Sequence, residues 1–437
     1  MALGGGTWLT QNKVLPGAYI NFVSAAKATA SLSDRGVVAM PLMLDWGKKG
    51  EMFTVTAEEF QKDSVKIFGH AYADEAMKGL RDLFMYAKTV HFYRLNGGTK
   101  AQNTYAQAKY FGTSGNKIKI TIRASVYESG KYDVITLFDG VEVDLQTVVA
   151  SSGLVENDFV IWKTFTMAAV TGAALTGGTS EDTAENSVYQ SFLDKAESYS
   201  FNVLACMSDV LAVQSLFINY TKRLRDDLGR KFQLVVYNAN PNTCDYEGVI
   251  NVATEAAGTN DYGNEAVYWV AGAEAGCAVN KSLANKVYDG EYDLDTNLTQ
   301  TQLEEALTAG KFVFHKVGDE VRVLDDINSL TTTTVEKGED FKSNQTIRVL
   351  DQIGNDIANL FNTKYSGQYP NDAAGRMSLW ADIVKHHQEL ERIRAIEDFN
   401  SDELKVEKGD AKNAVLVTDY VTPVNCMSKL YMTVIVQ

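Results

Sequence analysis

The chain of 437 residues is 45% hydrophobic and 22% charged, and its formal net charge is −15. This length exceeds what one hydrophobic core usually serves and the composition is that of globular proteins, so we expect several folded domains. The acidic balance argues against nucleic acid as a partner, and the lack of any apolar run near the roughly 18 residues that span a bilayer argues against direct membrane insertion.

Residues 1–10 lack the basic start and apolar centre of a signal peptide, which predicts a protein made and kept in the cytoplasm. The four cysteines, Cys206, Cys244, Cys277 and Cys426, are far apart in the sequence. This spacing favours reduced thiols in the core over a disulfide framework or a zinc site.

Both ends of the chain have the composition of β arms. Near the start, a Pro-Gly turn leads into a short apolar strand that contains Gly17, Tyr19, Ile20, Phe22 and Val23. Residues 429–437 are mostly β-branched or aromatic and are apolar on both faces: Leu430, Tyr431, Met432, Val434, Ile435 and Val436. A strand at a chain end needs something to hold it, either its own domain, in which it would be a closing strand, or the sheet of a neighbouring copy.

After the first arm, the pattern predicts a buried strand at 36–44, an amphipathic helix at 74–86 with acidic residues in its first turn, and a strand at 89–95. The next stretch is different. Strand-like runs at 117–126, 132–138 and 141–148 are joined by short turns, of which Asp139-Gly140 is a strong hairpin signal.

Two similar turns bracket this β-rich stretch, Leu-Asn-Gly-Gly-Thr at 95–99 and Leu-Thr-Gly-Gly-Thr at 175–179. We interpret them as hinges around an inserted all-β domain of residues 96–178. The hinge residues are then Gly97, Gly98, Gly177 and Gly178.

Helix and strand patterns alternate after this point: a helix at 187–200, a strand at 201–206, a helix at 209–228 and a strand at 232–237. This alternation predicts a parallel α/β layer. Residues 269–278 form a predicted helix of small residues that allows close packing, and its Gly-x-x-x-Gly lacks the further residues of a nucleotide loop. A helix at 303–309 and strands at 311–315 and 320–325 complete the block.

The C-terminal part contains two strongly amphipathic helices, at 344–365 and 376–397, followed by a strand at 414–420. A cationic cluster lies on or beside the polar face of the second helix. It consists of Lys385, His386, Arg392 and Arg394.

The sequence contains no arrangement that predicts catalysis. No histidine has metal-ligand spacing to another histidine or to a cysteine, and His386 and His387 should point about 100° apart on a helix. Neighbouring carboxylates such as Asp325 and Asp326 are interpreted as solvated faces or caps. We therefore predict no catalytic residue, no metal site and no cofactor.

Several segments, in order along nearly the whole chain, carry a resemblance to a known family. They are 16–20 (PGAYI), 110–116 (YFGTSGN), 175–179 (LTGGT), 245–252 (DYEGVINV), 269–276 (WVAGAEAG), 325–330 (DDINSL), Lys342 with 347–357 (IRVLDQIGNDI), Gly375-Arg376 and 427–434 (MSKLYMTV). In this order they resemble the contractile tail sheath family of phage tails, prophage tails and R-type bacteriocins; residues 1–12 lie outside the pattern.

The resemblance implies a subunit of stacked hexameric rings that surround a tail tube and contract to drive it through a cell envelope. It implies partners in other copies of the chain, in the tube protein and in baseplate and terminator proteins, and it implies production in a bacterial host and release in a virion or tail-like particle. It also implies that the terminal arms are exchanged between copies and that Lys385, His386, Arg392 and Arg394 face the tube.

The expected fold is α+β and multidomain, with a mixed α/β core, an inserted all-β domain and terminal β arms. The expected division is an N-terminal arm (1–24), the first part of the core (25–95), an outer β-rich domain (96–178), a central α/β domain (179–330) and a C-terminal domain (331–437) that ends in a β arm from about residue 425. Two other functions stay open, another tail structural protein of tube or baseplate type, and an enzyme with a scattered α/β site.

Overall fold

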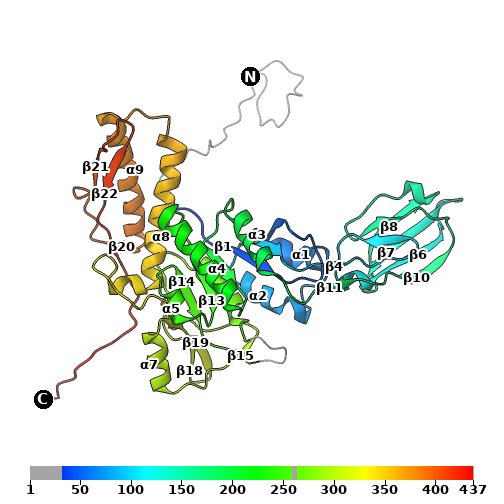
Figure 1. Ribbon diagram of the computed structural model, residues 1–437, viewed down its shortest axis with the longest axis horizontal. Helices are drawn as coiled ribbons and strands as arrows, with labels where there is room; N and C mark the ends of the chain where they lie inside the picture. The colour runs from blue at the N-terminus through cyan, green and yellow to red at the C-terminus, as the bar shows by residue number, and fades with distance from the viewer. Residues whose placement is uncertain (1–31, 258–262, 437) are drawn as a thin grey trace, which may run out of the picture. The chain divides into compact units, whose positions relative to one another are not determined.

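The computed structural model describes residues 32–257 and 263–436 (Figure 1). The chain forms two compact units. The large unit contains residues 34–354 and, after the chain returns, residues 423–436; the small unit contains residues 355–422 together with 32–33. The predicted N-terminal arm residues Gly17, Tyr19, Ile20, Phe22 and Val23 lie outside the described residues.

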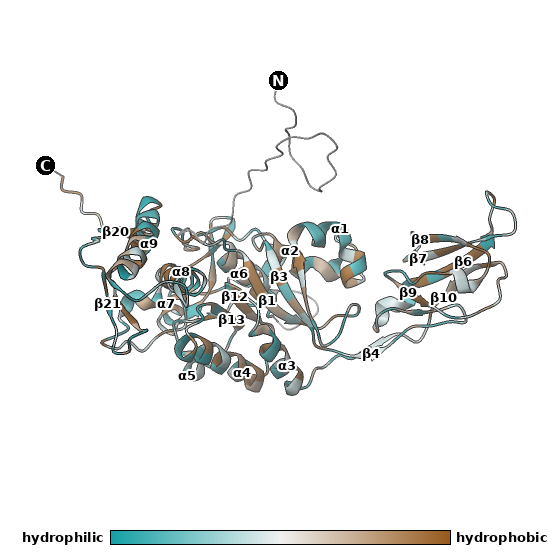
Figure 2. Ribbon diagram, turned by 90° about the horizontal axis from the view of Figure 1, so that it is seen from above, coloured by the Kyte–Doolittle hydropathy of each residue, from teal (hydrophilic) through white to brown (hydrophobic). Residues whose placement is uncertain are grey.

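A seven-stranded sheet forms the centre of the large unit, in the order β17-β14-β13-β12-β1-β3-β2. The strands are β1 Val37–Leu42, β2 Met52–Thr56, β3 Thr89–Arg94, β12 Val203–Cys206, β13 Gln233–Tyr237, β14 Val249–Val252 and β17 Lys311–Phe312. All neighbours are parallel except β2, which pairs antiparallel with β3 at one edge. The predicted parallel α/β layer is confirmed, and the inner strands are hydrophobic because helices cover both faces (Figure 2).

Alternating residues of β1 point to two cores. Val38 and Met40 pack in one core with α1 Ala57–Phe68, α2 Lys78–Phe84 and α6 Ala266–Gly276. Ala39 packs in the other, with α3 Asn186–Ala196 and α4 Leu211–Lys222. The period of two along a strand therefore places one apolar set against each helical layer.

Some predicted helix ends were wrong, and two helices, α1 and the four-residue α5 Pro241–Cys244, were not predicted. The predicted helix 74–86 is a 3₁₀ turn, Glu75–Met77, followed by α2, and the predicted helix 209–228 is α4 followed by a π-type turn at Arg223–Asp227. Helix α1 was missed, although the sequence marks its start with a capping box. Thr56 accepts a hydrogen bond from the Glu59 amide while the Glu59 carboxylate accepts from the Thr56 amide.

Helix α6 packs closely against α2, as its small residues predict. A Cβ added at Gly272 would lie 2.3 Å from the Leu83 carbonyl oxygen, and one added at Gly276 would lie 2.4 Å from the Tyr86 carbonyl oxygen. Backbones that approach this closely leave no room for a side chain. The glycine spacing therefore serves helix packing.

The shorter elements of the large unit lie around this sheet. They are α5 Pro241–Cys244, α7 Gln300–Thr308, the pair β15 Ala256–Ala257 and β16 Asp293–Leu294, and the hairpin of β18 Phe314–Val317 and β19 Glu320–Val323. In the described part of the chain, no helix is long and apolar enough to cross a membrane.

Residues 98–180, here called the β region, form a four-stranded antiparallel sheet in the order β10-β6-β7-β8 and a smaller pair, β5-β9. The strands are β5 Ala106–Ala108, β6 Ile118–Ala124, β7 Tyr132–Phe138, β8 Val141–Val148, β9 Val160–Trp162 and β10 Val170–Ala174. The turn between β7 and β8 is the predicted Asp139-Gly140, and both residues have positive φ, 49° and 83°. The predicted hairpin is confirmed.

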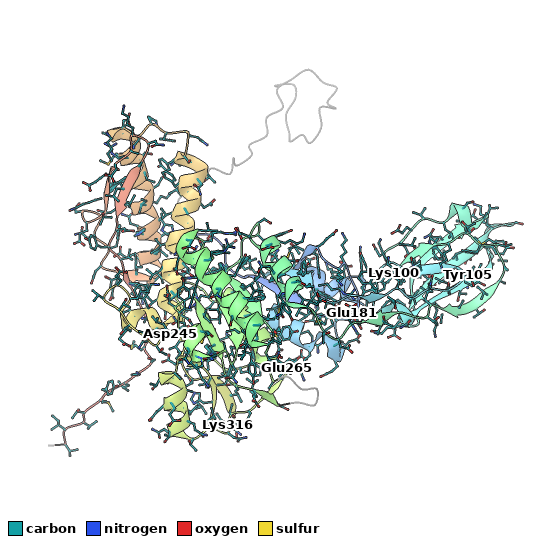
Figure 3. All side chains as sticks on the ribbon, in the orientation of Figure 1. Lys100, Tyr105, Glu181, Asp245, Glu265 and Lys316 are labelled. Carbon is teal, nitrogen blue, oxygen red and sulfur yellow. The ribbon has the colours of Figure 1, made fainter. Side chains whose placement is uncertain are left out.

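The chain enters and leaves the β region through two adjacent strands. β4 Gly98–Thr99 pairs antiparallel with β11 Thr179–Ser180, and the Gly97 amide donates to the Glu181 carboxylate, a residue labelled in Figure 3. A Cβ at Gly98 would lie 1.9 Å from the Thr179 oxygen, and one at Gly178 would lie 2.5 Å from the Gly112 oxygen. Close approach of another backbone gives Gly98 and Gly178 a packing role. The predicted hinge movement about Gly97, Gly98, Gly177 and Gly178 stays a prediction.

Trp46 joins the core of the β region to the rest of the large unit. It follows β1, is fully buried, and its ring lies 5.2 Å from Tyr110, 6.0 Å from Phe138 and 6.2 Å from Phe159, measured between centroids. Its indole N–H donates to the Lys66 carbonyl. The β region is therefore completed by a side chain from outside it.

The small unit is mostly helical. Helix α8 Asn344–Leu360 leads into it and continues as a π-type turn, Phe361–Tyr365, and α9 Ala373–Arg392 follows. Leu360, Tyr365, Leu379, Ile383, Val384 and Leu404 form its core. The hairpin of β21 Lys405–Lys408 and β22 Val415–Thr418 packs on α9, and the short strands β20 Ile396–Glu397 and β23 Thr422–Pro423 are paired.

We expect the β region to be removable if Trp46 is replaced as well. Thr99 and Thr179 are cross-strand partners, so a short Gly/Ser bridge can join the two strands. Removal alone exposes a large indole, so a chain lacking residues 100–178 should aggregate, whereas the same deletion with Trp46→Ser should stay soluble. Solubility and circular dichroism provide the measurement. Loss of helical signal in both chains would contradict the idea of an independent β region.

Candidate assembly surfaces

The last ten described residues, 427–436, form no helix or strand in the single chain and expose their side chains. Leu430, Tyr431, Ile435 and Val436 are 84, 90, 82 and 90% exposed, and Met432 and Val434 are similarly open. The alternative of a closing strand within its own domain is therefore wrong for this structure. Residues 427–436 are called the C-terminal arm here. The residues at its base belong to the large unit rather than to the small one.

An apolar segment of this length rarely stays exposed on a monomeric soluble protein. Its composition favours a strand, yet no strand among residues 32–257 and 263–426 pairs with it. The arm consequently has unused backbone donors and acceptors along its length. A strand edge on another molecule could satisfy them.

The hairpin β21-β22 offers edges of that kind. It is a sheet of only two strands, so each strand has one unpaired edge in the described structure. Leu416 and Val417 on β22 are 55 and 38% exposed. An isolated two-stranded sheet gains stability when further strands extend it.

The cationic cluster on α9 is smaller than the sequence predicts. Lys385, Arg392 and Arg394 are exposed, and Arg392 makes two hydrogen bonds to Glu389 at 2.6 and 2.7 Å. Within the described residues, Lys385 and Arg394 make no ion pair, so their charges are open to a partner.

His386 cannot face a partner, and its inclusion in that surface was wrong. It is 1% exposed, and its Nε2 lies 3.0 Å from the Asp356 carboxylate. His387 is also buried and lies 2.8 Å from Asp419. The two rings meet at their Nδ1 atoms, 3.4 Å apart, rather than diverging.

A cluster of buried charges, which the sequence did not reveal, lies at the start of α8. The Arg348 guanidinium is fully buried and contacts Glu274 at 2.6 Å and Asp326 at 3.3 Å. Asn344 donates to both carboxylates. Asp326 was interpreted as a solvated residue, but it is 3% exposed and also accepts from Ser282 and from the Leu283 amide.

The two carboxyl groups of this cluster have opposite pKa shifts. Burial, and then the charge of Asp326, raises the pKa of Glu274 to about 8. Burial opposes ionisation of Asp326 as well, but Arg348 and several hydrogen bonds hold its pKa below the ordinary value. Asp326 is therefore the favoured anionic partner of Arg348, and the raised pKa of Glu274 favours its protonated form at neutral pH, which limits the cost of burying three ionisable groups.

Helix α8 buries its polar side more completely than its predicted apolar stripe. Leu350, Ile353 and Ile357 are only partly buried, whereas Arg348 and Asp351 are buried. Asp351 forms a bidentate pair with Arg225, at 2.6 and 2.8 Å. The part of the helix that belongs to the large unit thus makes charge-assisted hydrogen bonds in addition to burying Ile347 and Val349.

The thiols are free, as predicted, but they are not all in the core. Cys206, Cys244 and Cys277 are buried, whereas Cys426 is exposed at the base of the arm. In the described residues, no group of three or more histidine, cysteine, aspartate or glutamate side chains is placed to hold a metal ion.

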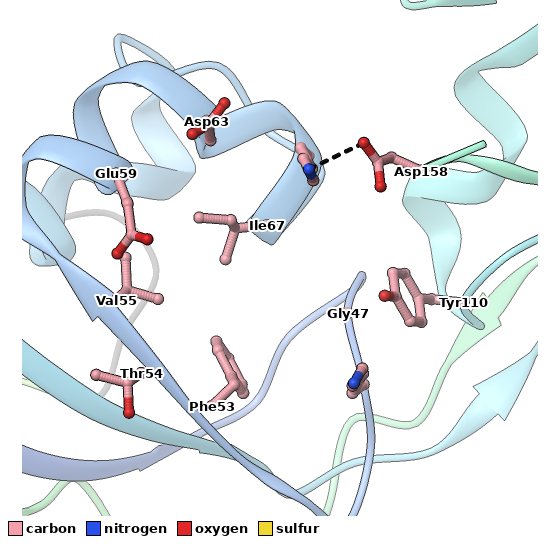
Figure 4. Close-up of a pocket in the computed structure, with 11 residues that line it drawn as sticks. Gly47, Phe53, Thr54, Val55, Glu59, Asp63, Ile67, Tyr110 and Asp158 are labelled. Carbon is pink, nitrogen blue, oxygen red and sulfur yellow. Dashed lines mark ion pairs between the residues drawn. The ribbon is translucent and has the colours of Figure 1, made fainter. Parts of the chain in front are cut away.

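A hollow of about 290 Å³ lies between α1, β2 and the β region (Figure 4). Phe53, Val55, Ile67 and Tyr110 line it, and Lys66 forms an ion pair with Asp158 at 2.9 Å. The Glu59 carboxylate, which also lines the hollow, already accepts the hydrogen bond from Thr56 in the capping box. These residues join two parts of the fold and do not form a catalytic arrangement.

Models of phage tail sheath domains match the chain in four consecutive segments. They describe the domain III N-terminal region of tail sheath protein Gp18 (residues 35–95), a sheath β-sandwich domain (96–182), the sheath central domain (182–329) and the sheath C-terminal domain (336–437).

Individual proteins agree with these matches. The phage-like element PBSX protein XkdK of Bacillus subtilis (strain 168) is 34% identical, and the alignment covers 99% of both chains. The crystal structure of a sheath tail protein from Desulfitobacterium hafniense superimposes with a TM-score of 0.82 at 36% identity, over 94% of this chain and 98% of that one. The helical sheath of the anti-feeding prophage in its contracted state shares the fold, with a TM-score of 0.59 at 13% identity over 97% of this chain and 99% of that one.

Replacing Glu274 should change how stability depends on pH. Because folding raises the pKa of Glu274, its contribution to stability is full below the unfolded pKa and is lost as the pH rises toward about 8, by up to about 1.4 kcal/mol per pH unit. Glu274→Gln mimics the protonated acid and should avoid this loss. Denaturant unfolding should show the variant equal to wild type near pH 4.5 and more stable at pH 8.

The matched control is Glu304→Gln, at an exposed position on α7. The difference in unfolding free energy between Glu304→Gln and wild type should stay constant with pH. A constant difference for Glu274→Gln as well would contradict the assignment of a buried proton to this cluster.

Proposed function

This chain belongs to the phage tail sheath protein family, and from that premise we propose that it is the repeating subunit of a contractile sheath. Copies polymerise as stacked hexameric rings around a tail tube, and contraction of the rings drives the tube through a cell envelope. The role is structural and requires no catalytic residue or cofactor. The observation that carries the proposal is the exposed apolar arm at residues 427–436 of an otherwise folded chain.

The arm links one subunit to the next in this proposal. Its backbone pairs with the free edge of the β21-β22 hairpin of a neighbouring copy, where Leu416 and Val417 receive its apolar side chains. The residues assigned to the N-terminal arm, Gly17 to Val23, add a second strand of the same kind. Backbone hydrogen bonds on arms can keep subunits connected while folded units rotate as bodies.

The tube-facing surface consists of Lys385, Arg392 and Arg394, without His386. Their charges meet acidic groups on the tube protein, and salt weakens the contact because the side chains are exposed. Other copies, the tube protein, the baseplate and the terminator protein are the partners in this proposal. The finished particle is a virion or a released tail-like particle made in a bacterial host.

A chain that ends at Met427 should fold and stay monomeric but form no sheath. The removed side chains are exposed, so their loss should leave the thermal unfolding of the monomer within a few degrees of that of the full chain. Polymerisation depends on every link of an open array, so it should be lost completely. Negative-stain imaging under assembly conditions measures this outcome, and deletion of residues 17–23 should have the same effect.

Two results would refute arm exchange at the C-terminus. One is a truncated chain that still forms sheaths of normal length. The other is a truncated chain that is unfolded as a monomer, because the arm would then belong to its own core.

Charge reversal on α9 should impair extended assembly around the tube. Lys385→Glu is the cleaner single change because Lys385 has no ion pair in the described structure, and adding Arg392→Glu should strengthen the effect. Lys62→Glu on α1, also exposed, is the control and should assemble normally. The measurement is the length of extended sheaths at several salt concentrations. Unchanged sheaths for Lys385→Glu with Arg392→Glu would remove this surface from the proposal.

A further inference from the structure

The three residues before the free arm are held by the first turn of α8. Gln345 is 2% exposed; its Nε2 donates to the Val424 carbonyl and its Oε1 accepts from the Cys426 amide, both at 2.9 Å. The two backbone groups belong to residues that are two apart. A residue of a neighbouring parallel strand bonds in the same way, so the side-chain amide of Gln345 stands in for a strand partner.

Asn425, between these two residues, is held by the same turn. Its Oδ1 accepts from Ser343 Oγ and from Thr346 Oγ1, each at 3.2 Å, while its Nδ2 lies 3.1 Å from Thr346 Oγ1. Thr346 is buried, whereas Asn425 is exposed and reaches it from the surface. Every residue from 424 to 426 therefore has a hydrogen bond to the helix, and every residue from 427 to 436 is exposed.

The same turn of α8 is fixed on its other side. Asn344 bonds to Glu274 and Asp326 and accepts from Gln233 of β13. Arg348, one turn later, completes the buried cluster with those two carboxylates. The hydrogen bonds of Gln345 and of its covalent neighbour Asn344 thus connect the base of the arm to the central sheet.

We propose that Ser343, Gln345 and Thr346 form an anchor that fixes residues 424–426 to the large unit, sets the point from which the arm leaves, and transmits the pull of a neighbouring subunit to the central sheet. The second half of this proposal rests on the proposed exchange of the arm between copies. The first half concerns the single chain alone. The anchor keeps the arm extended at its root, so that only residues beyond 426 are free to find a partner.

The anchor is tested first in the full-length monomer. The backbone amide of Cys426 donates a hydrogen bond to the Gln345 side chain, and Cys426 is exposed. The hydrogen-exchange rate of this amide therefore reports directly on the anchor. Gln345→Ala should accelerate that exchange at least tenfold, while the exchange of the β13 amides should not change. Gln190→Ala, an exposed glutamine on α3, is the matched control and should leave the Cys426 rate unchanged.

Asn425→Ala provides a second variant that leaves α8 intact, in case Gln345→Ala does not fold. It should also accelerate the exchange at Cys426. Unchanged exchange in folded Gln345→Ala or in Asn425→Ala would overturn the anchor, whatever the sheath does.

Sheath assembly tests the second half of the proposal, in which the anchor transmits the pull of a neighbouring subunit to the central sheet. Sheaths made from Asn425→Ala or Gln345→Ala subunits should be shorter and should break more often on contraction than wild-type sheaths. Faster exchange at Cys426 together with sheaths of normal length and integrity would overturn the transmission of force. If the chain ending at Met427 polymerises, arm exchange fails, and the exchange rate in the monomer still decides whether the anchor exists.

Discussion

The buried contact between Arg348 and its two carboxylates constrains the whole central part of this fold. A guanidinium taken out of water must keep its partners, so the first two turns of α8, helix α6 and the segment around Asp326 are tied to one place. The raised pKa of Glu274 favours its protonated form at neutral pH, which limits the charge buried around Arg348. Asn344 lies one turn before Arg348 and bonds to the same two carboxylates, and Gln345 is its neighbour, so the position of the arm's base follows from the position of this cluster.

Local patterns predicted the elements that depend on neighbours in sequence. Alternating helices and strands predicted the parallel sheet, Asp139-Gly140 predicted the hairpin, and small residues predicted the close contact of α6 with α2. Each of these signals lies within a short window. Helix α1 could have been found in the same way, from the capping residues Thr56 and Glu59.

The features missed by the sequence arise between distant segments. Glu274, Asp326 and Arg348 come from separate elements, so no spacing along the chain brings them together. His386 shows the same limit, because a polar residue on a predicted polar face is buried once Asp356 supplies a partner. The interpretation of a helix face from its pattern alone fails when buried ion pairs are added to hydrophobic contacts, as they are on α8.

The composition of the arm has a consequence for the accuracy of assembly. Leu430 to Val436 contain no charge, proline or glycine and are apolar on both faces. A strand with one polar face resists a slip of one residue, because the slip would bury that face, but this segment carries no such penalty. Uncharged segments of this kind also stack readily with their own copies in unplanned registers. In the proposed exchange between copies, correct register must then come from where the strand begins, and a short tether from the proposed anchor limits the offsets at which two copies can meet.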